Sequence, residues 1–315
     1  MNTPLLSVIS PVYNKGKYLE QTIASFRPGQ ESDVELIFVD DGSTDHSPEI
    51  LRSFEKYPNV RILTQENKGA PAARNAGFEV STGRYIWFFD ADDYVNEGSL
   101  RTVKAHLQNM KAQLLTADYT NVTHDGKFLN EVRYAGSRLA ITRKDKLLYA
   151  YLAPPYPGNK IYVREVIDRH HIRFADVRLA QDLNFYLKYL AYVDRIEYVQ
   201  ESLTNYRVVD GSISHSYDER LLEIIRSLEE VDDFCAATLD EARKRYLKMA
   251  GYSHLIYQLS RLEQVADEQL RQRMREALTE KIRQTRKPIR CIRPYERFKL
   301  AKLDAYYRDT VTTLR

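Results

Sequence analysis

The sequence predicts an α/β fold, with a doubly wound, mainly parallel sheet and a helical C-terminal appendage. Over the first 120 residues, short apolar runs alternate with segments whose apolar residues repeat at helical spacing. Polar clusters rich in aspartate and asparagine follow several of these runs directly. From about residue 217 to about residue 286 the apolar spacing is helical almost throughout.

Short apolar runs predict the strands, because each is bounded by polar residues and is too short for a helix. They cover residues 5–10, 34–39, 60–63, 84–89 and 113–119. The segments between these runs predict amphipathic helices. Their inward residues are Leu19, Ile23 and Phe26, then Ile50, Leu51 and Phe54, then Leu100, Val103, Leu107 and Met110, and residues 69–79 form an Ala-rich helix.

The middle of the chain is less regular. Asp125-Gly126 predicts a hairpin turn, because this pair suits the positive φ angles of a tight connection. Residues 180–192 predict a helix with its leucines inward, and residues 203–208 predict a strand. Residues 217–286 predict two or three amphipathic helices.

The composition is that of a globular protein, with 43% hydrophobic and 29% charged residues among 315 and a net charge of +3. The two cysteines, Cys235 and Cys291, are too far apart to indicate a metal-ligand motif or a disulfide framework. We see no signal peptide and no apolar run long enough to span a bilayer. We therefore expect a cytoplasmic protein, soluble or peripheral to the membrane.

Polar clusters follow the predicted strands at Pro11 to Asn14, at Asp40 to Asp45 and at Asp90 to Asp93. Ligands of parallel sheets bind at the carboxyl ends of the strands, so we expect these clusters to converge on one rim. In the third cluster, Asp90, Asp92 and Asp93 would repel one another unless a cation lies among them or water solvates them. Carboxylate oxygens suit Mg²⁺ and Mn²⁺, which also take phosphate oxygens, whereas the alternative is a solvated acidic turn.

The other two clusters could bind a nucleotide base. The Asp41 carboxylate could accept the N3–H of uracil, with Gly42 allowing close approach, although the same segment could simply cap a helix. Tyr13 could stack on a base and Pro11 could present its carbonyl, with a plain strand-to-helix turn as the alternative. Arg74 could pair with phosphate or with Asp90 or Asp92, or lie on a surface helix.

Four motifs occur in order along the chain, PVYN, VDDGSTD, NKGAPAARNAG and FDADD. In these the sequence resembles the family 2 glycosyltransferases of GT-A fold, especially the bacterial enzymes that build surface polysaccharides. The resemblance is strong over residues 5–120, fainter to about residue 216, and lost in the C-terminal hundred residues. It implies a GT-A domain of residues 1–215, with a nucleotide-sugar half (1–120) and an acceptor and catalytic half (120–215), before a helical region of residues 216–315.

The resemblance implies an inverting transfer from a nucleotide-sugar, with UDP preferred, to a glycan or lipid-linked acceptor, assisted by Mn²⁺ or Mg²⁺. By it, Asp92 is the principal metal ligand, and Asp90 contacts the ribose or the metal. The residues expected at the nucleotide-sugar are Pro11, Val12, Tyr13, Asn14, Asp41, Asn67, Gly69, Arg74, Asp90, Ala91, Arg207 and His215. Arg207 and His215 match a loop that closes over the diphosphate, where they could stabilise the leaving group; a surface turn is the alternative.

The resemblance also implies a catalytic base on a helix of the second half. Family members often carry Glu-Asp there, and this chain has Gln181-Asp182, which keeps the aspartate. Displacement with inversion needs a group that takes the proton of the acceptor hydroxyl, and Asp182 is the candidate. The alternative is a residue that only opens its helix.

The segment 281–303 carries nine basic residues and one acid between Lys281 and Lys302, interleaved with apolar residues. This pattern predicts that the segment binds an anionic membrane surface. The alternatives are a solvated basic helix and a contact in a homo-oligomer. We do not expect the segment to bind nucleic acid, because it lacks a recognisable nucleic-acid-binding module.

Other functions fit the sequence less well. A nucleotide-sugar-binding protein without transfer activity would lack the metal ligand or the catalytic base, yet Asp92 and Asp182 are present. A nucleotidyltransferase would need a glycine-rich, basic triphosphate loop, which PVYNKGKY is not. A dinucleotide oxidoreductase would need a GxGxxG motif after the first strand.

Overall fold

The computed structural model describes residues 3–133, 143–177, 179–209 and 218–314. The chain divides into two compact units. The first comprises Met1–Leu139, Tyr156–Asp176 and Val193–Val209, and the second comprises Ala140–Pro155, Val177–Tyr192 and Asp210–Arg315. The sequence suggests one boundary near residue 215, whereas the second unit also takes in two earlier segments. The roles assigned to the halves of the predicted transferase domain stay predictions.

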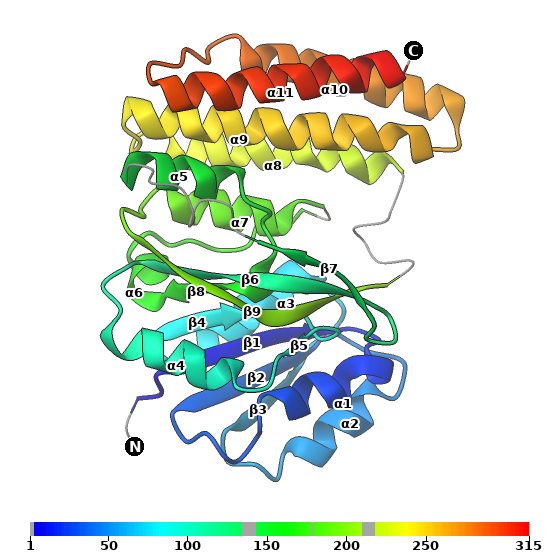
Figure 1. The fold of residues 1–315 in the computed structure, drawn as a ribbon. Coiled ribbons are helices and arrows are strands. Elements are labelled where there is room, and N and C mark those ends of the chain that lie inside the picture. The colour runs from blue at the N-terminus through cyan, green and yellow to red at the C-terminus, as the bar shows by residue number, and fades with distance from the viewer. Residues whose placement is uncertain (1–2, 134–142, 178, 210–217, 315) are drawn as a thin grey trace. The chain divides into compact units, whose positions relative to one another are not determined.

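The first unit contains the sheet and the helices that cover it (Figure 1). Its strands are β1 (Leu6–Val12), β2 (Val34–Asp40), β3 (Val60–Thr64), β4 (Tyr85–Phe88), β5 (Tyr94–Val95), β6 (Leu114–Thr123), β7 (Phe128–Val132), β8 (Lys160–Val163) and β9 (Ile196–Val208). Its helices are α1 (Gly16–Ser25), α2 (Ser47–Phe54), α3 (Ala70–Val80), α4 (Ser99–Asn109) and α6 (Arg164–Arg169).

The sheet is mixed and mostly parallel, in the order β3-β2-β1-β4-β8-β6-β9-β5, with β7 paired to β6. The first four strands of this order are parallel, and β6 runs parallel to β9, whereas β8 is antiparallel to both of its neighbours. The predicted α/β class is therefore confirmed. One boundary is corrected, because β1 continues through Pro11 and Val12, which pair with Val39 and Asp40.

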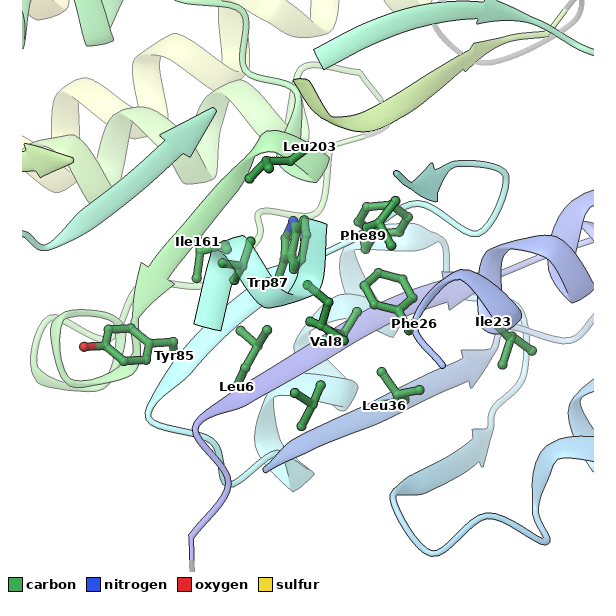
Figure 2. Packing of buried hydrophobic residues seen from close by; sticks show 14 of the residues in the cluster. Leu6, Val8, Ile23, Phe26, Leu36, Tyr85, Trp87, Phe89, Ile161 and Leu203 are labelled. Carbon is green, nitrogen blue, oxygen red and sulfur yellow. The ribbon is translucent and has the colours of Figure 1, made fainter. Parts of the chain in front are cut away.

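Helices cover both faces of the sheet because successive side chains of a buried strand point to opposite sides. On one face, Leu6, Val8 and Leu36 pack with Ile23 of α1 and with Phe26, directly after that helix (Figure 2). On the other face α3 lies against Ile9, Ile37 and Val39. A Cβ atom added at Gly77 of α3 would lie 2.5 Å from Cγ2 of Ile9, so only glycine permits this close packing.

The buried strand β4 places the acidic cluster. Its residues are fully buried, and Phe89 beyond it has no exposed surface. Edge-to-face contacts join Phe26 to Trp87 and Phe89, with ring centroids 5.7 and 4.9 Å apart. The chain therefore leaves the core at Asp90 in a fixed position.

The second unit is helical. It contains α5 (Arg143–Leu152), α7 (Gln181–Leu190), α8 (Glu223–Cys235), α9 (Glu241–Ser260), α10 (Glu268–Arg286) and α11 (Pro294–Thr313). Helices α8, α9 and α11 run side by side (Figure 1). The predicted helix at 180–192 and the helical stretch at 217–286 are confirmed in the described residues, and α11 lies within the helical region expected at 216–315. None of the described helices is long and apolar enough to cross a membrane.

Candidate active site

The loops that follow β1 and β2 are joined through Asn14. Its backbone N–H donates to Ser43 Oγ at 3.1 Å, and its side-chain oxygen accepts the backbone N–H of Thr44 at 2.8 Å. Asn14 has a positive φ of 51°, which asparagine tolerates better than most residues. The backbone N–H of Gly16, at the start of α1, also donates to Asp45 at 2.9 Å. The first two polar clusters therefore form one surface.

Asp41 joins the loop after β2 to the loop before α3. It is buried, and its two carboxylate oxygens accept the backbone N–H groups of Lys68 and Gly69, each at 2.8 Å. Gln65 donates to the same carboxylate at 2.7 Å. A carboxylate has lone pairs beyond these three bonds, so the expected contact with a base stays a prediction.

Arg74 holds Asp90. The guanidinium lies 2.6 Å from Asp90 Oδ1 and above the Phe174 ring, with only 3% of the residue exposed. Of the partners expected for Arg74, the structure shows an ion pair with Asp90. Asn75, one residue further along α3, exchanges two hydrogen bonds with the Phe174 backbone and fixes this stacking ring.

Lys15 forms an ion pair with the Asp92 carboxylate. Burial alone would lower the pKa of the Lys15 ammonium, but the charges of Asp92, Asp90 and Asp93 outweigh it and raise the pKa. The Lys15 ammonium is thus paired with Asp92, the side chain that the sequence predicts as the principal metal ligand.

Asp93 points into the protein and is 1% exposed. It accepts hydrogen bonds from the Tyr156 hydroxyl at 2.6 Å and from the Arg207 backbone N–H at 2.8 Å. Burial, together with the charges of Asp92 and Asp90, raises the pKa of Asp93 well above its usual range. Asp93 therefore anchors the acidic loop and does not face a ligand.

Arg207, near the end of β9, anchors the same loop. Its guanidinium donates to the Asp92 backbone carbonyl and to Gln21 Oε1, the latter at 2.6 Å. It also lies over the rings of Tyr18 and Tyr94, and the residue is 4% exposed. In this structure the charge of Arg207 is thus directed at the protein; its expected action on the leaving group stays a prediction. His215 lies outside the described residues.

The remaining predicted donor residues differ in exposure. Val12 and Ala91 are buried in the core, so only their backbone could face a ligand. Tyr13 is 46% exposed, and Asn67 is exposed as well. Gly69 is the N-cap of α3 and has a φ of 87°, and Pro11 lies half-buried within β1. An exposed ring and exposed amides are the groups at this rim that a base could reach.

Asp182 belongs to the second unit. It lies in the first turn of α7, partly exposed, after Ala180 with a left-handed φ of 62°. The helix is fixed within its unit, because the Asn184 side chain donates to the Ser227 carbonyl at 3.0 Å. A partly exposed aspartate in the first turn fits both the expected catalytic base and a residue that only opens its helix, so the role of Asp182 stays a prediction.

The acidic loop can supply part of a metal site. Within the described residues, no group of three or more His, Cys, Asp and Glu side chains could hold a metal ion. Asp90 and Asp92 each bind one basic side chain, and no other side chain bonds to the Asp92 carboxylate in the described part of the chain. Mg²⁺ commonly takes one or two protein carboxylates and completes its shell with phosphate and water. The carboxylates of Asp90 and Asp92 therefore fit a metal ion that a diphosphate also binds. Such an ion would compete with Lys15 for the Asp92 carboxylate.

Comparison with known proteins identifies the family. The model of glycosyl transferase family 2 matches residues 7–170, more than half of the chain. The chain belongs to glycosyl transferase family 2. It is therefore a nucleotide-sugar glycosyltransferase. Among its relatives is TuaG of Bacillus subtilis, whose name assigns it provisionally to teichuronic acid biosynthesis; the two are 31% identical over 67% of this chain and 82% of TuaG.

Two solved structures share the fold. TarS 1–349 of S. aureus, solved with UDP-GlcNAc, matches with a TM-score of 0.69 and 20% identity over 98% of this chain and 91% of that one. A mannosyltransferase of Pyrobaculum calidifontis, solved with GDP-Man and Mn²⁺, matches with a TM-score of 0.57 and 16% identity over 99% and 87%. The expected GT-A-like fold is confirmed, and the likeness to TarS extends over the C-terminal helices, where the sequence motifs are lost.

Several residues that hold the site were not predicted from the sequence. Lys15 and Gln21 bond to the acidic loop and to Arg207, and Tyr156 bonds to Asp93. The Thr22 hydroxyl lies within hydrogen-bond distance of the Ala91 and Asp93 carbonyls. None of these residues belongs to a motif, and their partners are distant in sequence, so no local signal marks them.

Proposed function

We propose that this glycosyltransferase moves a sugar, with inversion, from a UDP-sugar to a hydroxyl of a glycan or lipid-linked acceptor in cell-surface polysaccharide synthesis. The observation that carries the proposal is the convergence of four loops around Asp90 and Asp92. Hydrogen bonds and ion pairs join these loops into one rim that also exposes Tyr13. The UDP-GlcNAc complex of TarS and the name of TuaG support the donor and the pathway.

The rim supplies the groups that a nucleotide-sugar needs. Tyr13 offers an exposed ring on which a base can stack. Asp92 and Asp90 would hold Mn²⁺ or Mg²⁺ together with the oxygens of the diphosphate. Such an ion neutralises the charge that develops on the departing diphosphate. Lys15, which is paired with Asp92, would compete with this ion for the carboxylate.

Asp182 would act as the general base. A single displacement at the anomeric carbon needs one group that removes the proton of the attacking hydroxyl, and it needs no covalent sugar–enzyme intermediate. The family resemblance supports this role, as does the partly exposed position of Asp182 at the start of α7.

Donor binding is tested by thermal shift with a panel of nucleotide-sugars, each with and without Mn²⁺. A ligand that binds the folded state raises the melting temperature. We expect a metal-dependent shift with a UDP-sugar that Asp92→Ala abolishes and Glu97→Ala, at an exposed carboxylate five residues further along, retains. If no nucleotide-sugar shifts the wild-type protein, the proposed donor site is wrong.

Turnover tests the base. Asp182→Asn should lower kcat by roughly a hundredfold or more and leave donor affinity near that of the wild type, because the base acts in the transition state. Asp176→Asn, at an exposed position, is the control and should change neither value. Product NMR should show an inverted anomeric centre. A retained configuration, or full turnover in Asp182→Asn, would remove this mechanism.

A further inference from the structure

The start of α11 exposes two large apolar side chains. Ile292, two residues before the helix, is 66% exposed, and Phe298 in the helix is 54% exposed. Both lie in the second unit. Large apolar side chains grouped on a surface mark interaction sites more often than single exposed residues do.

Four exposed cations accompany them, namely Lys287, Arg290, Arg297 and Lys302. No carboxylate of the described residues forms an ion pair with any of the four. The Lys302 ammonium lies 4.7 Å from the centre of the Phe298 ring, so charge and apolar surface share one face of α11. We call these four cations, with Ile292 and Phe298, the α11 surface.

Of the acids on α11, Glu296 is buried and Asp304 is partly exposed and ion-paired, whereas Asp309 is exposed near the C-terminal end of the helix. Glu296 has no exposed surface; it lies 3.5 Å from Arg245 and accepts the backbone N–H groups of Ile292 and Arg293 at 2.9 and 3.3 Å. Asp304 binds the guanidinium of Arg286 at 2.7 and 2.9 Å. Glu296 therefore fixes the backbone that presents Ile292, and neither carboxylate offsets the exposed positive charge.

We propose that the α11 surface docks the enzyme on an anionic phospholipid bilayer. Cations bind the lipid phosphates, while Ile292 and Phe298 enter the interface between headgroups and acyl chains. A polyanion such as a nucleic acid would use the cations and leave the two apolar side chains in water. A second copy of the chain would bring the same cations to the contact and repel. The pairing of charge with exposed apolar residues favours the membrane.

The test measures binding of the full-length protein to vesicles by sedimentation. Vesicles of phosphatidylglycerol mixed with phosphatidylcholine are compared with phosphatidylcholine alone. We expect binding to the anionic vesicles, weakened by salt. Arg290→Gln with Lys302→Gln should weaken it by about fivefold for each charge removed, and Ile292→Ser with Phe298→Ser by about tenfold or more. Point variants are preferred to a chain cut at Gln284, because the cut would also remove Glu296 and Asp304.

Matched controls use exposed residues of the first unit. Arg101→Gln with Lys111→Gln removes the same charge, and Phe128→Ser removes a ring that is 69% exposed. Both controls should bind like the wild type. The proposal is overturned if the wild type ignores anionic vesicles, if controls and test variants lose binding equally, or if Ile292→Ser with Phe298→Ser only converts an oligomer to monomers. Transfer to a water-soluble acceptor is measured separately, so a failure here does not reflect on catalysis.

Discussion

Single residues at the rim combine two tasks, because the groups expected to bind ligand also hold the loops together. Asp41 accepts three hydrogen bonds from the segment before α3, and Arg74 is committed to Asp90. These contacts within the protein fix the rim, which lowers the cost of ordering it on binding. Lys15 belongs to the same set, since its ammonium forms an ion pair with the Asp92 carboxylate, the expected metal ligand.

Lys15→Met should tighten Mn²⁺ binding. The variant removes a positive charge in direct contact with Asp92, and charges a few ångströms apart interact by roughly 1–4 kcal/mol near a protein surface. We expect about a tenfold lower Kd for Mn²⁺ in the presence of UDP, measured by electron paramagnetic resonance of the free ion. Lys17→Met, at an exposed position two residues further along, should leave the Kd unchanged. An unchanged or higher Kd in Lys15→Met would mean that Lys15 does not compete with the metal.

At the level of elements, α3 carries Gly69 and Arg74 to the rim, and its position depends on Gly77. A Cβ at Gly77 would lie 2.5 Å from Ile9 Cγ2 and 3.2 Å from Val39 Cγ2, atoms that belong to central strands and have little room to move. Gly251, inside α9, offers a contrast, because its nearest neighbour would be a Leu228 methyl at 3.4 Å.

Gly77→Ala should therefore destabilise the protein, and Gly251→Ala should not. Alanine gains about 1 kcal/mol of helix propensity at either site, but overpacking at Gly77 costs about 1–3 kcal/mol. We expect a net loss of up to about 2 kcal/mol for Gly77→Ala and a neutral or stabilising effect of up to about 1 kcal/mol for Gly251→Ala. Urea unfolding followed by circular dichroism compares the two midpoints, and equal midpoints would contradict this account of the packing.

The elements were predictable where periodicity and burial agree. The strands predicted at 5–10, 34–39, 84–89 and 113–119 and the helix at 180–192 appear near the expected places because each combines a clear pattern with a core position, whereas the short strand β5 has no such pattern and was not predicted. The partners of Asp92 and Asp93 were not predictable, since Lys15, Tyr156 and Arg207 come from three separate segments. The sequence names the residues at the rim; only the fold shows which of them hold one another.

For the whole molecule, the two units are interleaved along the chain, since α5 and α7 come from segments that precede residue 215. Both helices pack on later ones of their own unit. Tyr151 of α5 meets the Tyr246 ring at a centroid distance of 6.0 Å, and Lys188 of α7 pairs with Glu230 at 2.5 Å. The predicted boundary at 215 would therefore separate these helices from their partners.

A fragment of residues 1–215 should fail to fold as a monomer. Leu148 and Tyr151 on α5, with Leu187 and Leu190 on α7, are almost completely buried in the whole chain. Exposing side chains of this size costs about 1.5–3 kcal/mol each, and together this approaches the full stability of a typical domain. We expect the fragment to aggregate on gel filtration and to lack the fluorescence of a buried Trp87, which is the single tryptophan of the chain. A monomeric fragment with native fluorescence and cooperative unfolding would show instead that the sheet holds α5 and α7 without the C-terminal helices.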